Sequence, residues 1–114
     1  MNHVDARTLN WRDTPMPDSS GPVQLARLPD RDDGGFRALV RFPPGWRRDI
    51  AGHYNVSEEI LILEGALSID AVTARVGDWL WIAACEVRTV TSAPDGCLAF
   101  ACFGGVPQWV RGDA

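Results

Sequence analysis

The sequence predicts an all-β protein of antiparallel sheets, and three observations lead to this prediction. The chain of 114 residues contains eleven Gly and eight Pro, which is typical of a backbone that reverses direction often. Apolar residues make up 46% and charged residues 23%, so the chain can bury a core and is not of the disordered kind. The apolar residues fall in short runs separated by Gly, Pro, Asp or Ser, a spacing typical of a sandwich or barrel.

The N-terminal segment is expected to stand apart from the barrel. The stretch TPMPDSSGP combines proline with small polar residues, which disfavour a helix and a central strand. The length of the chain is that of a single domain. We therefore expect an extended arm over residues 1–22 and one barrel domain over residues 23–114.

The first two strands are expected over residues 23–28 and 36–42. VQLARL alternates weakly between apolar and polar residues, and the turn-forming stretch PDRDDGG follows it. FRALVRF then places four apolar residues on one face and two arginines, Arg37 and Arg41, on the other.

Later strands are expected over residues 53–65, 67–76, 77–84, 87–92 and 97–103. A helix over residues 57–67, SEEILILEGAL, is the alternative, because Glu and Leu favour helices. The two isoleucines and the early Gly65 leave that helix too short, so we favour a strand.

Composition also excludes several kinds of partner and chemistry. All eleven basic residues are Arg, so the chain has no lysine to act as a base or to form a Schiff base. The net charge is −4 and the arginines form no stripe, which argues against nucleic acid. No apolar run is long enough to span a membrane. The three cysteines have no CxxC spacing, which indicates a reduced, cytoplasmic protein without disulfides.

Two stretches resemble the two sequence motifs of the cupins. They are GHYN followed by EEILILEGAL, and then VGDWLWIAACEVR. The flanking ALVRFPPGW and GCLAFACF also resemble the cupin-like domain of zinc-binding anti-sigma factors and of small stand-alone cupins. The resemblance covers residues 23–103. It implies a double-stranded β-helix, a jelly-roll barrel of two antiparallel sheets with its site inside.

The resemblance also implies a metal site, which this sequence matches only in part. His53 stands at the first histidine of the cupin set, and Asn55 at the second. Counting back from the motif glycine selects Glu58 as the acid, whereas unbroken alternation from His53 would select Glu59. A divalent Zn, Fe, Ni or Mn ion could use His53, Glu58 (or Glu59) and Asn55. The last histidine is replaced by Arg88, which cannot donate to a metal. We therefore favour a degenerate site without metal.

Arg88 suggests a different use of the same position. If its side chain points into the barrel, its fixed charge takes the place of the metal's charge and can pair with Glu58. That pair could be purely structural, or it could clamp a small anion, and the sequence leaves both open. The expected function is thus that of a barrel that binds a small, anionic molecule, or of a sensory or interaction module. The expected ligand-binding residues are His53, Asn55, Glu58 and Arg88. The alternative is a metal-dependent enzyme of dioxygenase or isomerase type.

Remaining residues are given packing or surface roles. Trp79 and Trp81 share one face of a strand, which favours a core or subunit contact over a ligand platform and predicts a homodimer. Tyr54 alternates with His53 and should face away from the cavity. Arg47 and Arg48 are expected in a solvated loop, the alternative being an anion contact at the barrel mouth.

Overall fold

The computed structural model describes residues 1–112, and their regular structure is almost entirely β. A 3-10 helix, η1 (Ala6–Thr8), precedes eleven strands, and no helix in this part of the chain is long and apolar enough to cross a membrane. The all-β prediction is confirmed, and residues 57–67 form strand rather than helix. The strands are β1 (Trp11–Thr14), β2 (Val23–Arg27), β3 (Phe36–Phe42), β4 (Trp46–Arg48), β5 (Gly52–Tyr54), β6 (Glu58–Ile69), β7 (Val72–Arg75), β8 (Trp79–Ile82), β9 (Thr91–Ala93), β10 (Cys97–Phe103) and β11 (Trp109–Arg111).

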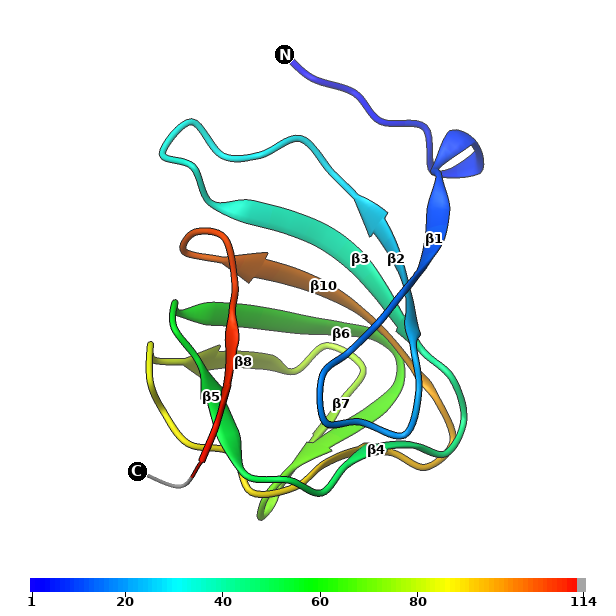
Figure 1. Ribbon diagram of the computed structural model, residues 1–114. Helices are drawn as coiled ribbons and strands as arrows, with labels where there is room; N and C mark the ends of the chain where they lie inside the picture. Colours follow the sequence, from blue (N-terminus) through cyan, green and yellow to red (C-terminus); the bar gives the residue numbers. More distant parts are fainter. Residues whose placement is uncertain (113–114) are drawn as a thin grey trace.

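The strands form one large curled sheet and one small sheet, with antiparallel pairing throughout. The large sheet has the order β1-β2-β3-β10-β6-β9-β4, and β7 and β8 also pair with β6; the small sheet joins β5 to β11. Figure 1 shows β3, β10, β6 and β8 side by side in a curved layer, with β5 and β11 crossing in front of it. This arrangement confirms the expected jelly-roll barrel.

Strand β6 belongs to both sides of the barrel because it bends in its middle. Its first half pairs with β10 and β8, and its second half pairs with β7 and β9. At the bend Gly65 has φ +71°, and a Cβ there would overlap the Gly96 carbonyl. A glycine is needed for both reasons.

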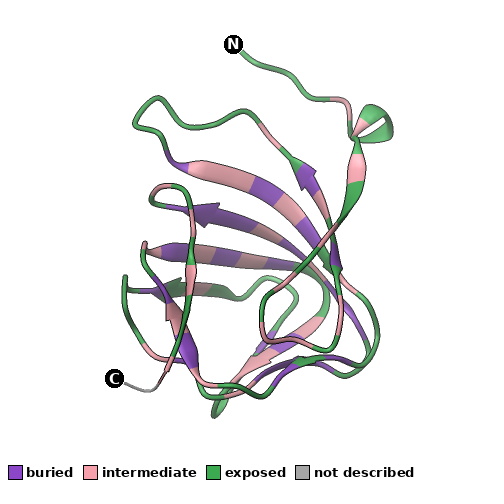
Figure 2. Ribbon diagram, viewed as in Figure 1, coloured by how far each residue is buried: buried purple, intermediate pink, exposed green. Residues whose placement is uncertain are grey.

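The core lies between the curved layer and the strands that face it. Alternating residues of β3, β6 and β10 are buried, and Figure 2 shows this as purple and pink bands along the strands. This alternation fixes which side chains can reach the interior.

Several strand boundaries differ from those expected. The segment 53–65 is divided between β5 and β6, and the strand expected over residues 87–92 begins only at Thr91. Within the expected arm, Trp11–Thr14 forms an edge strand that pairs with β2, so this part of residues 1–22 is tied to the sheet. The single strand expected over residues 67–76 is divided by a turn at Asp70, which has φ 52°. Its carboxylate oxygen accepts hydrogen bonds from the backbone N–H groups of Thr89 and Val90, so the turn also holds the β8–β9 loop.

Candidate ligand-binding site

A cavity of about 250 Å³ lies inside the barrel. Its lining is mostly apolar, and it includes aromatic side chains from β3, β4, β10 and β11. Five buried side chains with charged or hydroxyl groups also line it, and they come from five different segments: Arg48, Tyr54, Glu58, Arg88 and Thr91. Few polar groups in an apolar enclosure are the usual composition of a small-molecule site.

Arg88 and Glu58 form the ion pair that the sequence predicted. Nη2 of Arg88 lies 2.7 Å from Oε1 of Glu58, and the two side chains are 7% and 8% exposed. Glu58 begins β6, whereas Arg88 lies in the loop between β8 and β9, which is held by two backbone hydrogen bonds to Gly52. Burial raises the pKa of Glu58, and the charges of Arg88 and Arg48 oppose that shift only in part.

Arg48 is the second cation of the cavity, and the sequence did not predict its position. It is 3% exposed, while its neighbour Arg47 lies at the surface and pairs with Asp49. The expectation of a solvated loop is therefore wrong for Arg48. Since β4 alternates and Trp46 is buried, the residue two positions later lies on the same inward face.

The Arg48 guanidinium is held from three sides. Nε donates to the carbonyl oxygen of Pro17 at 2.9 Å, and Nη1 donates to the hydroxyl of Tyr54 at 3.2 Å. The guanidinium carbon lies 3.9 Å from the ring centre of Trp109, a cation–π contact. Nη2 has no hydrogen-bond partner among residues 1–112, and neither does Nε of Arg88.

Tyr54 stands between the two arginines. Their guanidinium carbons lie 5.7 Å (Arg48) and 4.9 Å (Arg88) from its ring centre. Burial raises the pKa of the Tyr54 hydroxyl, so the neutral phenol is favoured. The expectation that Tyr54 faces away from the cavity is wrong. The reason is the packing of β5 on β11: a Cβ at Gly52 would overlap the indole of Trp109, so positions 52 and 54 face the interior.

The inward position of Tyr54 removes His53 and Asn55 from the cavity. His53 is partly buried and does not line it, and Asn55 is exposed and accepts a hydrogen bond from the backbone of Gln108 at 2.7 Å. Glu59 faces the outside of the sheet, where it pairs in register with Trp81 and Cys102. The structure thus brings Glu58 and Arg88 together and leaves His53, Asn55 and Glu59 elsewhere. In the described part of the chain, no three His, Cys, Asp or Glu side chains are grouped as metal ligands.

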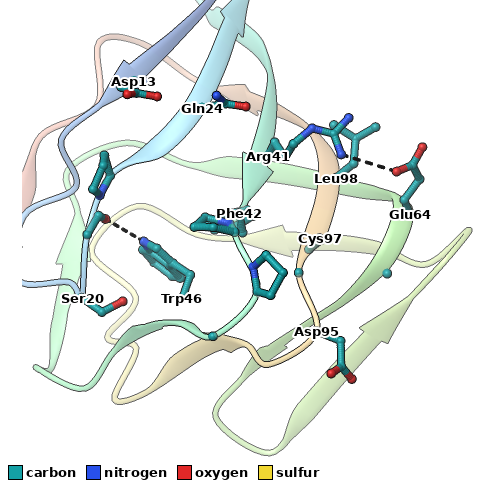
Figure 3. Close-up of a pocket in the computed structure, with 17 residues that line it drawn as sticks. Asp13, Ser20, Gln24, Arg41, Phe42, Trp46, Glu64, Asp95, Cys97 and Leu98 are labelled. Atoms are coloured by element: carbon teal, nitrogen blue, oxygen red, sulfur yellow. Dashed lines mark hydrogen bonds and ion pairs between the residues drawn. The ribbon is translucent and has the colours of Figure 1, made fainter.

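A second, larger hollow of about 760 Å³ opens on the outside of the barrel (Figure 3). Phe42 and Trp46 line both hollows and separate them. Some polar groups of the outer hollow are already paired: Arg41 lies 3.6 Å from Glu64, and the indole N–H of Trp46 donates to the carbonyl of Gly21. Burial raises the pKa of the Cys97 thiol to about 11, so this thiol is not ionised at neutral pH. The inner cavity is therefore the better candidate.

The sequence matches no protein-family model and no curated protein. Its structure, however, is similar to that of an acetylacetone dioxygenase from Acinetobacter johnsonii, with a TM-score of 0.76, 14% identity, and coverage of 97% of this chain and 85% of that chain. An RmlC-like cupin protein from Ralstonia eutropha JMP134 is similar with a TM-score of 0.70 and 17% identity, and the match covers 96% of this chain and 71% of that chain. A chain of the Rhodobacter sphaeroides complex of SigE with the anti-sigma ChrR is similar with a TM-score of 0.69 and 22% identity, and the match covers 87% of this chain and 51% of that chain.

At these identities the likenesses show the fold. The solved structures that resemble the chain are cupin-fold proteins, and they include dioxygenase-type and decarboxylase-type members. The chain covers most of the length of the dioxygenase and about half of the chain in the sigma-factor complex.

Proposed function

Because the chain has the cupin fold and encloses two arginines in one cavity, we propose that it is a barrel that binds a small anion. Arg48 and Arg88 are the binding groups, while Glu58 and Tyr54 position them. In this proposal the ancestral metal site is degenerate, and the fixed charge of Arg88 occupies the position of a metal ligand.

The charge of the cavity carries the proposal. Two guanidinium groups face the cavity, and one carboxylate opposes them. The buried surroundings disfavour the ionised form of that carboxylate, so at least one positive charge lacks a counter-charge. Burying such a charge is costly unless an anion compensates it. Nη2 of Arg48 and Nε of Arg88 would donate to that anion, since both lack partners among residues 1–112.

Calorimetry and thermal unfolding with acetate, benzoate, phosphate, sulfate and chloride test the proposal. A specific anion at a hundred times its dissociation constant should stabilise the protein by about 2.7 kcal/mol. Arg48→Met should abolish this stabilisation, while Arg47→Met, a change at the exposed neighbouring arginine, should leave it intact. Stabilisation by no anion, or equal stabilisation of Arg48→Met, would overturn the proposal.

A metal-dependent enzyme is the second candidate, and the dioxygenases among the similar structures favour it. Glu58 is the one acidic residue that lines the inner cavity, and the described residues supply no histidine to it. Elemental analysis of the purified protein decides this question. Stoichiometric zinc, iron, nickel or manganese that is lost in Glu58→Gln would establish this alternative over the first.

The outer face of the large sheet is proposed to join two copies of the chain. Its residues alternate with those that line the cavity, and the strand registers align an apolar row across six strands. We call it the outer row; Trp79 at its end is 59% exposed. The outer row consists of Trp79, Leu61, Phe100, Leu39, Ala26 and Trp11, of which Ala26 is buried, Trp79 is exposed and the other four are partly buried.

Charges beside the outer row fit a symmetric dimer. Glu59 on β6 and Arg37 on β3 flank Cys102 of β10 at one level, and Glu64 and Arg41 flank Leu98 at another. A two-fold axis along β10 with the faces packed together would set each glutamate against an arginine of the second copy. Opposite charges around an apolar centre thus support the homodimer.

The three cysteines are free thiols, one exposed and two buried. This supports the proposal of a reducing, cytoplasmic setting.

A further inference from the structure

We infer that the anion bound in the cavity is a monocarboxylate with a compact, flat apolar body, of the size of benzoate. This inference rests on the proposed function, because it assigns the chemical class of the ligand to the same two arginines.

The number of free donors favours a carboxylate over a tetrahedral anion. Arg48 offers Nη2 and Arg88 offers Nε, while their other contacts are to Pro17, Tyr54 and Glu58. The two nitrogens carry three N–H donors, which is enough to satisfy both oxygens of one carboxylate. Phosphate or sulfate would turn further oxygens toward hydrocarbon, and unpaired buried oxygens are costly.

The net charge of the cavity favours a ligand with a single negative charge. At a pH above the raised pKa of Glu58, its carboxylate neutralises Arg88 and the guanidinium of Arg48 is the remaining charge. Arg48 is 3% exposed, and its guanidinium lies against the ring of Trp109. A second carboxylate on the ligand would be buried without a cation.

The remaining walls favour an apolar, flat body. Aromatic rings line the cavity on several sides, among them Phe36, Phe42, Trp46, Phe103 and Trp109. Aromatic rings attract one another in tilted or offset geometry, and burying apolar surface contributes about 25 cal/mol per Å². Acetate or formate would leave most of this surface without a partner.

The volume limits the size of the ligand. A space of about 250 Å³ corresponds to roughly eight times the share of one water in the liquid, so it holds on the order of ten non-hydrogen atoms. It lies just below the usual range for drug-sized ligands. A single ring with a carboxylate fits this limit, whereas a fused polycyclic acid does not.

Isothermal titration calorimetry with matched compounds tests the inference. Benzoate should bind at least tenfold more tightly than acetate, than its neutral analogue benzamide and than the dicarboxylate phthalate. Arg48→Met should remove the preference for benzoate over benzamide. Ala99→Leu places a larger side chain of β10 in the cavity. It should lower the affinity for benzoate by at least tenfold and the affinity for acetate much less. Unfolding curves establish that each variant is folded.

The possible failures can be told apart. If acetate or phosphate binds in an Arg48-dependent manner and benzoate binds no more tightly, the inference is overturned and the proposed function stands. If benzamide binds as tightly as benzoate, or if no anion binds, both the inference and the proposed function are overturned.

Discussion

Arg88 and Glu58 meet inside the barrel at 2.7 Å, although 30 positions separate them in the sequence (88 − 58), and each side chain is less than a tenth exposed. A buried pair of this kind is costly to break, because removing one partner leaves the other charge buried alone. The contribution of the pair to the free energy of unfolding and its contribution to ligand binding can be separated by substitution.

Arg88→Met is expected to lower the free energy of unfolding by about 3 to 5 kcal/mol at neutral pH. The reason is that the Glu58 carboxylate loses its nearest cation while it stays buried. Arg88→Met combined with Glu58→Gln should recover most of that loss. Urea unfolding measures both variants, and a loss below about 0.5 kcal/mol in the single variant would mean that the pair is solvated.

Glu58→Gln is expected to become more stable relative to the wild type as the pH rises above about 4.5, the ordinary carboxyl value. Burial raises the pKa of Glu58, so in this window the folded protein holds a proton that the unfolded chain has released. Stability therefore falls as pH rises through the folded pKa, by roughly 1.4 kcal/mol for each unit of difference. Unfolding curves between pH 4 and 8 measure this. Glu64→Gln, at an exposed glutamate, should show no such trend.

Cys85 adopts φ 65° at an exposed position, a conformation that disfavours side chains. We expect stability in the order Cys85→Gly, wild type, Cys85→Val, with the valine variant about 1 to 2 kcal/mol below the wild type. Ala84→Val, one residue earlier and also exposed, should change little. Thermal unfolding measures the order, and a valine variant as stable as the wild type would contradict the expected strain.

Arg37→Glu and Glu59→Arg are each expected to weaken the proposed dimer by about tenfold in dissociation constant, because each sets like charges together. The double variant reverses both charges and should restore dimerisation. Sedimentation analysis measures the constants. Arg75→Glu, on the exposed strand β7, is the control. A monomeric wild type, or no rescue in the double variant, would rule out this face.

The combination Arg88→His with Tyr54→His is expected to create a site for zinc or nickel with Glu58, because all three positions line the cavity. Arg88→His with Asn55→His is expected to create none, since the side chain of Asn55 is exposed. Metal-dependent thermal shifts compare the two. Equal metal binding by the two variants would mean that a side chain at position 55 reaches the interior as well as one at position 54.

The fold and one side of the cavity could be predicted from sequence because glycines mark them. Gly65 fixes the bend of β6, and counting back from it selected Glu58; counting from Gly77 placed Arg88. Each count runs along one continuous motif, so errors in the position of the selected residue do not accumulate.

The other side of the cavity could not be predicted in the same way. Strands β4 and β5 have only three residues each, too few for alternation to show which face is buried. The orientation of β5 depends on Trp109 packing on Gly52, a contact across 57 positions (109 − 52). Arg48 could have been found by taking Trp46 as buried and stepping two residues along the strand.

The place of β10 between β3 and β6 also bears on how the protein is made. During synthesis both neighbours are made before residues 97–103 exist, so each lacks its shared partner strand until then. The barrel can close only at that late moment, which makes folding slow and dependent on distant contacts. A nascent chain paused before residue 97 would therefore be the form most exposed to aggregation and to chaperones.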